Sequence, residues 1–198
     1  QYLDQVPQLI AENSYTKQLS AGKTPCYLLD THVSPSHTKL VVKHFPANNT
    51  VKRWFDSRLK NGTPSQRHWR IANALWQLNK TTPMPVALIE DPRSHQSYLI
   101  TRYESNSSLK QEIDHILQTT QSSDELVSLL KYVIEQIRKL HHAGYIHGDL
   151  GNQNILLNRT ATGWTDIGFI DLNRCRRHPA PTLKQRAKDL DRLKFPSF

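Results

Sequence analysis

The chain has 198 residues, of which 37% are hydrophobic, and a formal net charge of +9 at pH 7. This length allows one core or two small lobes and excludes two large independent domains, and no apolar run approaches the roughly 18–20 residues of a membrane span. The positive charge indicates an anionic partner, such as a nucleotide, a phosphorylated glycan, an acidic lipid surface or nucleic acid.

The first half of the chain is predicted to be rich in strands. Gly22 supplies the turn of an expected hairpin, and apolar residues at helical spacing predict a helix over residues 65–78, with Ser65 as its N-cap. Five strands are predicted: two flank this turn, the third is a short run of β-branched and apolar residues, and the last two are joined by a turn-rich segment. These strands are expected at residues 15–20, 25–30, 39–45, 84–90 and 97–103.

After residue 103 the pattern becomes mainly helical. The clearest helix is predicted over residues 124–143, because its apolar residues form a sustained stripe and Gly144 is suited to end it. The other elements of this part are short. They are helices at residues 109–117 and 182–193, the latter basic, and strands at residues 155–158 and 168–171.

The residue types best suited to chemistry lie between the long helix and the strand that follows it. The run His-Gly-Asp-Leu-Gly-Asn-Gln-Asn places a carboxylate at Asp149 and an amide at Asn154, and a second carboxylate, Asp171, ends a later apolar strand. Lys43 lies in the third predicted strand. Each of these residues alone has an ordinary structural explanation, but together they follow the order Lys, Asp, Asn, Asp that is found in kinases.

Phosphoryl transfer from ATP needs this set of side chains. Asp149 is predicted to orient an acceptor hydroxyl and take its proton. Asn154 and Asp171 are predicted to hold Mg²⁺ against the phosphates, and Lys43 to neutralise the α- and β-phosphates. The His-x-Asp-x-x-x-x-Asn spacing is the most specific part of this prediction.

The segments 141–157 and 169–176 resemble the lipopolysaccharide kinase (Kdo/WaaP) family, and residues 66–75, 83–90 and 98–103 are also similar to it. Members of that family are kinase-like proteins of Gram-negative bacteria that phosphorylate sugars of the lipopolysaccharide inner core. The resemblance spans nearly the whole chain, although only the first two segments are specific. It implies that the acceptor is a sugar hydroxyl of the lipopolysaccharide core.

For the four side chains named above, the resemblance implies the nucleotide, catalytic and metal roles of the family. It also implies that adenine stacks at a hinge formed by Tyr103 and Glu104. The sequence departs from the kinase pattern in two respects. Without a Gly-x-Gly-x-x-Gly loop, Gly22 alone is expected to cover the phosphates, and the first predicted helix has His68 where an acid would pair with Lys43.

The order of elements and the motifs together predict an α+β, bilobal, protein-kinase-like fold. A strand-rich N-lobe is expected at residues 1–103, and a minimal, mostly helical C-lobe at residues 104–198. Because the chain stops soon after the metal-binding segment, the second lobe is expected to be short or truncated.

The predicted partners follow from the charge and from the resemblance. Eight basic residues follow Asp171. They could form a patch that binds an anionic glycan or glycolipid, or an ordinary solvated surface, and the sequence favours neither. Residues 1–10 lack the layout of a signal peptide, so a cytoplasmic location is expected, with peripheral contact at the inner membrane. Nucleic-acid binding is not expected, because no recognised motif supports it.

Two alternative functions remain open. The first is a Ser/Thr protein kinase or a small-molecule phosphotransferase, since a glycine such as Gly148 after the histidine is common among small-molecule kinases. The second is a pseudokinase that binds nucleotide without transferring phosphate. The missing helix acid and the short second lobe favour it, whereas the retention of Asp149 and both metal ligands argues against it.

Two further patterns are not interpreted as functional. The Ser-Ala-Gly-Lys-Thr run around Gly22 imitates the end of a Walker A loop, but Lys17 stands where that motif needs a glycine, and strand-like residues follow. His141 and His142 lie on different helix faces and do not indicate a metal site. His147, in a His-x-Asp loop, is expected to pack against the metal-binding segment.

Overall fold

A computed structural model describes residues 3–31, 38–47, 62–79 and 81–193. The chain divides into two compact units. The first comprises residues 1–77 and 83–104, and the second comprises residues 78–82 and 105–198. Among the described residues, no helix has the length and apolarity needed to cross a bilayer.

The first unit is built on a five-stranded antiparallel sheet with the strand order β1-β2-β3-β5-β4. All five predicted strands are present, with ends that differ by one or two residues from the prediction. Their bounds are β1 Lys17–Ser20, β2 Cys26–Thr31, β3 Thr38–Phe45, β4 Pro85–Glu90 and β5 Ser97–Arg102. Gly22 forms the turn between β1 and β2 with a φ of +105°, a conformation that glycine adopts readily.

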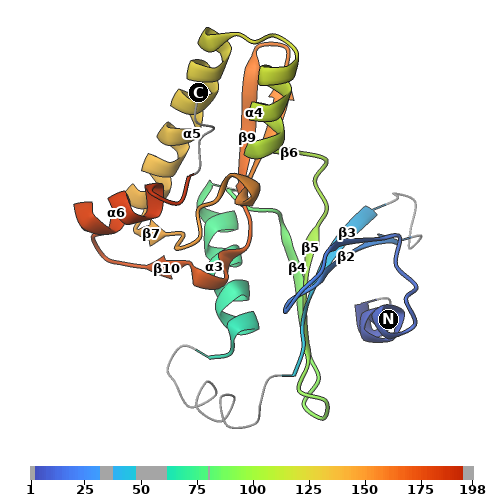
Figure 1. Ribbon diagram of the computed structural model, residues 1–198. Coiled ribbons are helices and arrows are strands. Elements are labelled where there is room, and N and C mark those ends of the chain that lie inside the picture. Colours follow the sequence, from blue (N-terminus) through green and yellow to red (C-terminus); the bar gives the residue numbers. More distant parts are fainter. Residues whose placement is uncertain (1–2, 32–37, 48–61, 80, 194–198) are drawn as a thin grey trace. The chain divides into compact units, whose positions relative to one another are not determined.

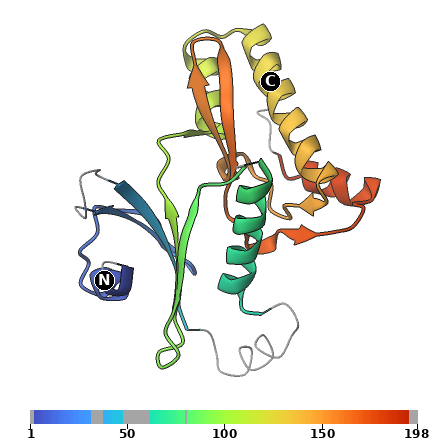
Figure 2. The ribbon, with the colours of Figure 1, turned by 180° about the vertical axis from the view of Figure 1, so that it is seen from behind.

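Helix α1 (Val6–Ala11) covers one face of this sheet and is not among the predicted elements. Val6 and Ile10 are buried there in one core cluster with Leu40 and Val42 of β3. Figures 1 and 2 show α1 on one face of the sheet and α3 on the other. An isolated helix of this length is unstable in water, so packing on the sheet stabilises α1 rather than any local signal.

Helix α3 (Pro64–Asn79) confirms the first predicted helix, but its N-cap is Thr63 and not Ser65. The Thr63 hydroxyl accepts a hydrogen bond from the backbone N–H of Gln66 at 3.3 Å, and the Gln66 side chain accepts one from the N–H of Thr63 at 3.1 Å. This reciprocal pair is a capping box. Ser65 is buried within the first turn of the helix, where its hydroxyl accepts a hydrogen bond from Ser97 at 2.8 Å.

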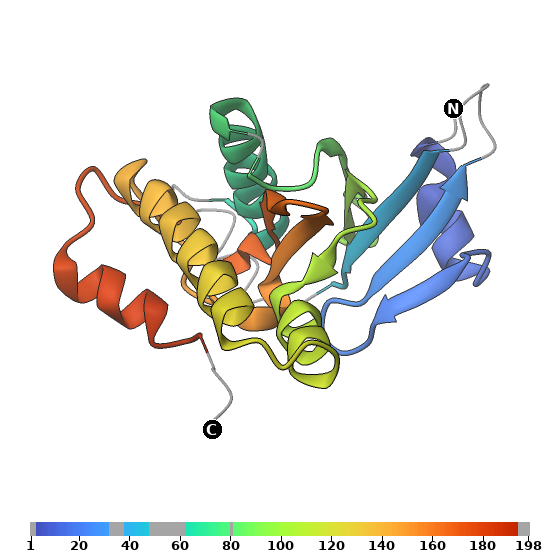
Figure 3. The same ribbon diagram turned by 90° about the horizontal axis from the view of Figure 1, so that it is seen from above.

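The described part of the second unit combines three α-helices with small sheets. Figure 3 shows its long helix α5 beside the β8–β9 hairpin. Strands β6, β8 and β9 form one sheet in the order β6-β8-β9, and β7 pairs with β10. The helices are α4 Leu109–Gln118, α5 Ser123–His142 and α6 Leu183–Leu190. The strands are β6 Ser107–Ser108, β7 Tyr145–Ile146, β8 Ile155–Thr160, β9 Gly163–Phe169 and β10 Arg176–Arg177.

The predicted helices of this unit are present, whereas the last strand differs from its prediction. Strand β9 begins at Gly163 and ends at Phe169, so Asp171 lies beyond the strand that was expected to contain it. Gly144 follows α5 with a φ of +89°, as its proposed role at the helix end requires.

A buried carboxylate joins α4 to the β8–β9 hairpin. The Glu112 side chain, only 6% exposed, accepts hydrogen bonds from the Arg159 guanidinium at 3.1 Å and from the Trp164 indole N–H at 2.9 Å. A buried charge needs such partners to offset the loss of hydration. The connection from α3 also belongs to this unit, because the carbonyl of Thr81 accepts the backbone N–H of Phe169 at 2.9 Å.

Candidate functional site

Three predicted site residues, Asp149, Asn154 and Asp171, line one cavity of about 910 Å³ in the second unit. Helix α4 and the segment that follows α6 complete its wall. The residues come from two loops that lie more than a dozen positions apart in the sequence. Their convergence is therefore a product of the fold and not of sequence proximity.

His147 connects these two loops and is fully buried. Its Nε2 lies 3.0 Å from the carbonyl oxygen of Ile170. Because a carbonyl only accepts, Nε2 carries the proton, and Nδ1 accepts the backbone N–H of Asp149 at 3.3 Å. Burial lowers the pKa of His147 despite the opposing charge of Asp189, so the imidazole is neutral at pH 7. The expected packing of His147 against the segment that carries Asp171 is confirmed.

Asn154 is oriented by the backbone of its own loop, residues 147–154, which we call the catalytic loop for the role predicted for Asp149. It ends the short 3-10 helix η2 (Asn152–Asn154), and its Nδ2 donates to the carbonyl of Asp149 at 2.8 Å. The carbonyl of Asn154 in turn accepts the N–H of Ile170 at 3.0 Å. Since the amide nitrogen is engaged in this way, Oδ1 is the side-chain atom suited to bind a cation.

Asp171 has an unusual backbone conformation just before the 3-10 helix η3 (Leu172–Arg174). Its φ is +58° and its ψ is +53°, which places it in the left-handed region. Aspartate is one of the few non-glycine residues that tolerates this region, and such outliers cluster at functional sites. One carboxylate oxygen, Oδ1, accepts a hydrogen bond from Asn173 at 2.6 Å.

Asp189 of α6 anchors the catalytic loop, a role that was not predicted from the sequence. It is 2% exposed. Its Oδ2 accepts hydrogen bonds from His141 at 3.0 Å and from the N–H of His147 at 2.9 Å, and its Oδ1 accepts the N–H of Gly148 at 2.8 Å. Burial opposes ionisation, but the hydrogen bonds outweigh it and the pKa of Asp189 is lowered from its ordinary value.

The sequence contained one signal for this anchor. Asp189 lies in the last turn of α6, where a negative charge is disfavoured by the helix dipole. An acid in that place requires a compensating partner. The prediction of a basic helix at residues 182–193 did not take this requirement into account.

Arg192, which follows α6, was also not singled out from the sequence. Its Nη1 donates to Oδ1 of Asp149 at 3.1 Å. It lies in the wall of the same cavity as Asp149 and Asp171.

Gly148 permits the close approach of two loops in this site. Its φ is +76°, and a Cβ at this position would lie 2.7 Å from the carbonyl oxygen of Arg174. Gly148→Ala is therefore expected to lower the free energy of unfolding by about 2 kcal/mol or more, from the left-handed strain and the clash with backbone. Chemical denaturation followed by circular dichroism measures this change.

Gly151 provides the matched comparison for stability. It lies in the same loop with an ordinary φ of −88°, and a Cβ added there would meet no heavy atom of the described chain within 4 Å. Gly151→Ala should therefore cost much less stability than Gly148→Ala. Equal losses in both variants would show that the approach of Arg174 to Gly148 does not constrain the loop.

The other predicted site residues lie in the first unit. Lys43 is in β3, is 9% exposed, and has its Nζ 5.8 Å from the centre of the Phe45 ring. His68 of α3 meets the same ring edge-on, with ring centroids 6.3 Å apart. Lys43 and His68 therefore lie near the same Phe45 ring, which agrees with the expectation that His68 occupies the place near Lys43 where kinases have an acid.

Gly22, Tyr103 and Glu104 also belong to the first unit. Gly22 is exposed at the hairpin tip, and Tyr103 and Glu104 directly follow β5. The N–H of Tyr103 donates to the carbonyl of Lys39 at 2.9 Å. Their assignment to a nucleotide site, like that of Lys43, stays a prediction.

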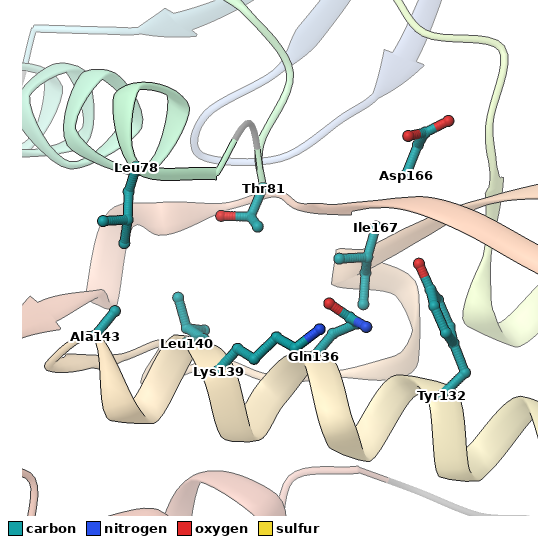
Figure 4. Close-up of a pocket in the computed structure, with 9 residues that line it drawn as sticks. All are labelled: Leu78, Thr81, Tyr132, Gln136, Lys139, Leu140, Ala143, Asp166 and Ile167. Carbon is teal, nitrogen blue, oxygen red and sulfur yellow. The ribbon is translucent and has the colours of Figure 1, made fainter.

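A second cavity of about 510 Å³ lies between α5 and β9 in the second unit and contains none of the predicted site residues. Figure 4 shows Tyr132, Gln136 and Lys139 of α5 facing Thr81 and Ile167 across it. In the described part of the chain, no group of three or more His, Cys, Asp or Glu side chains could hold a metal ion.

Kinases use a catalytic Asp together with an Asn and an Asp that hold the metal, and the larger cavity groups side chains of these three types. A solved structure described as WaaP in complex with acyl carrier protein has the same fold, with a TM-score of 0.64 and 18% sequence identity. The similarity covers 94% of this chain and 73% of that chain. In all, 1451 chains of solved structures match, so the fold alone does not determine a substrate.

The family profile described as "Lipopolysaccharide kinase (Kdo/WaaP) family" matches residues 30–198. The chain therefore belongs to this family, as the resemblance of its motifs predicted, and it is a phosphotransferase that acts on lipopolysaccharide. A search among curated proteins found no match.

Proposed function

We propose that this protein transfers the γ-phosphoryl group of ATP, in the presence of Mg²⁺, to a sugar hydroxyl of the lipopolysaccharide inner core. The observation that carries the proposal is the meeting of Asp149, Asn154 and Asp171 in one cavity. A catalytic carboxylate and two oxygen donors for the metal are recurring parts of the sites that catalyse this reaction.

Asp149 is the general base in this proposal. The acceptor hydroxyl gives its proton to the Asp149 carboxylate while its oxygen forms a bond to the γ-phosphorus. The bond from the γ-phosphorus to the bridging oxygen breaks at the same time, and ADP leaves with that electron pair. Most of the rate enhancement comes from positioning and from neutralisation of charge, since little covalent chemistry is left to the protein.

The residues present fit a magnesium ion. Oδ1 of Asn154 and the carboxylate of Asp171 are oxygen donors, the type that Mg²⁺ prefers, and Mg²⁺ usually completes its shell with water and substrate phosphates. The orientation of the Asn154 amide by the Asp149 carbonyl supports this assignment. When bound, the ion neutralises charge on the phosphates.

The nucleotide contacts are proposed to come from the first unit, as the N-lobe of a bilobal kinase at residues 1–103, with the C-lobe at 104–198. Lys43 neutralises the α- and β-phosphates, Gly22 covers them, and Tyr103 and Glu104 form the adenine hinge. The change of unit between Glu104 and Ser105 supports the placement of a hinge there.

The acceptor and partners are proposed from the family and from charge. A net charge of +9 suits the anionic core of lipopolysaccharide, whose kinases would work at the cytoplasmic face of the inner membrane. Because WaaP was solved in complex with acyl carrier protein, an acyl carrier protein is a candidate partner of this chain too.

Incubation with radiolabelled ATP and Mg²⁺ tests the proposal, with dephosphorylated core oligosaccharide and lysate proteins as separate acceptors. The oligosaccharide is expected to become labelled, and Asp149→Asn or removal of Mg²⁺ by EDTA should prevent this. Labelling of proteins alone would instead identify a protein kinase. Binding of ATP without transfer to any acceptor would identify a pseudokinase.

A further inference from the structure

The ion pair between Arg192 and Asp149 lies inside the candidate active site. The Nη1–Oδ1 distance is 3.1 Å, and the two side chains are 38% and 39% exposed. An ion pair with this exposure contributes little to stability. Its location in the wall of the cavity, on the predicted catalytic base, therefore calls for a functional explanation.

The backbone holds Arg192 in place. Its N–H donates to the carbonyl of Asp189 at 3.3 Å, and the next residue, Leu193, is buried at 8% exposure. Asp189 is itself bonded to the backbone of the catalytic loop. Residues three apart in a helical turn project from the same side. The turn from Asp189 to Arg192 therefore makes two kinds of contact with the catalytic loop: Asp189 binds its backbone, and Arg192 binds the side chain of Asp149.

The balance of charge in the cavity gives Arg192 a particular importance. Among the residues that the structure describes, the wall carries four carboxylates and two cations, namely Asp114, Asp149, Asp171 and Asp191 with Lys110 and Arg192. Lys110 forms an ion pair with Asp114 one turn along α4. Among these wall residues, Arg192 is therefore the cation that faces the catalytic carboxylate.

The pair engages only one oxygen of the base. Arg192 binds Oδ1 of Asp149, and Oδ2 accepts no hydrogen bond from the residues that the structure describes. We propose that Arg192 is a positioning residue, which fixes Asp149 through Oδ1 so that Oδ2 receives the proton of the acceptor hydroxyl. This inference rests on the proposed function, and it adds to it a residue that holds the base in its productive orientation.

Steady-state kinetics of Arg192→Ala and Arg192→Lys test this role. Arg192→Ala is expected to lower kcat by about 10- to 100-fold, the size of effect that a misplaced catalytic group produces, with less than about a twofold change in KM for ATP. Arg192→Lys keeps the charge and should recover part of the loss. Added guanidinium should partly restore Arg192→Ala and leave Asp149→Asn inactive.

Lys131→Ala is the matched control, since Lys131 is exposed on α5 and its loss removes the same charge from the same unit. Its kcat should equal that of the wild type. A kcat of Arg192→Ala equal to that of Lys131→Ala would overturn the inference, and so would a higher kcat, which would show that Arg192 masks the base. A loss of kcat with a lowered melting temperature and no rescue by guanidinium would assign a structural role instead. Absence of transfer by the wild type would reject the proposed function itself.

Discussion

Asp171→Asn is expected to remove nearly all phosphotransfer and to abolish the Mg²⁺-dependent stabilisation of the protein by ATP. The substitution removes the negative charge of the proposed metal ligand and leaves one neutral amide oxygen, so that no carboxylate of the proposed pair of ligands remains to bind Mg²⁺. Metal ions contribute several kcal/mol of charge stabilisation to such reactions. A loss of about 10³-fold or more in kcat/KM follows from that magnitude.

A thermal-shift titration with ATP, with and without Mg²⁺, measures the binding part of this prediction. ATP at 100 times its Kd stabilises the wild type by about 2.7 kcal/mol if it binds only the folded state. This gain should be present for the wild type with Mg²⁺ and absent for Asp171→Asn. Retention of the full Mg²⁺-dependent shift by Asp171→Asn would exclude Asp171 as a metal ligand.

Asp166→Asn is a suitable control for this experiment. Asp166 also has a positive φ, +49° against +58° for Asp171, and asparagine tolerates this region as well as aspartate does. The two substitutions therefore place the same demand on the backbone and make the same change of charge. Asp166 is absent from the wall of the larger cavity, so Asp166→Asn should retain the response to Mg²⁺ and ATP.

The elements with a strong local pattern could be predicted from the sequence. Strands β2 to β5 and the helix α5 have runs or stripes of apolar residues long enough to identify their type, whereas β1 contains only one apolar residue, Leu19, and was predicted from the turn at Gly22. Helix α1 could not be predicted in this way, because its six residues depend on the sheet beneath them for stability. The two-residue strands β7 and β10 likewise exist only through their pairing with each other.

The part of the candidate site that could be predicted consists of residues close together in the sequence. Asp149 and Asn154 are five residues apart in one loop, so their relation is visible in the sequence. Asp189 and Arg192 act on this loop from more than 40 positions away. The place of Asp189 in the last turn of α6 indicates only that its carboxylate needs a partner. Which groups it meets depends on how α6 packs on the catalytic loop.

The largest loss of stability among single changes at this site is expected for Asp189→Ala. The substitution leaves the His141 imidazole and the backbone N–H groups of His147 and Gly148 buried without their acceptor. Removal of one partner from a buried charged network costs about 3–5 kcal/mol. Phosphotransfer should be lost as well, because the loop that carries Asp149 loses its anchor. Urea denaturation followed by circular dichroism measures the loss of stability.

The pH dependence of stability separates the charge of Asp189 from its hydrogen bonds. Because its pKa is lowered in the folded protein, ionised Asp189 stabilises the fold above the unfolded pKa of about 3.9, and this contribution is lost as the pH falls through the lower folded value. Asp189→Asn keeps one acceptor oxygen and should remove this part of the acid dependence. Asp191→Ala, a change of an exposed acid two residues away, should leave this acid dependence intact.

The urea experiment has a clear contrary outcome. If Asp189→Ala unfolded at the same urea concentration as Asp191→Ala, the catalytic loop would have to be held by its other contacts, through His147 to Ile170 and through Asn154 to Asp149.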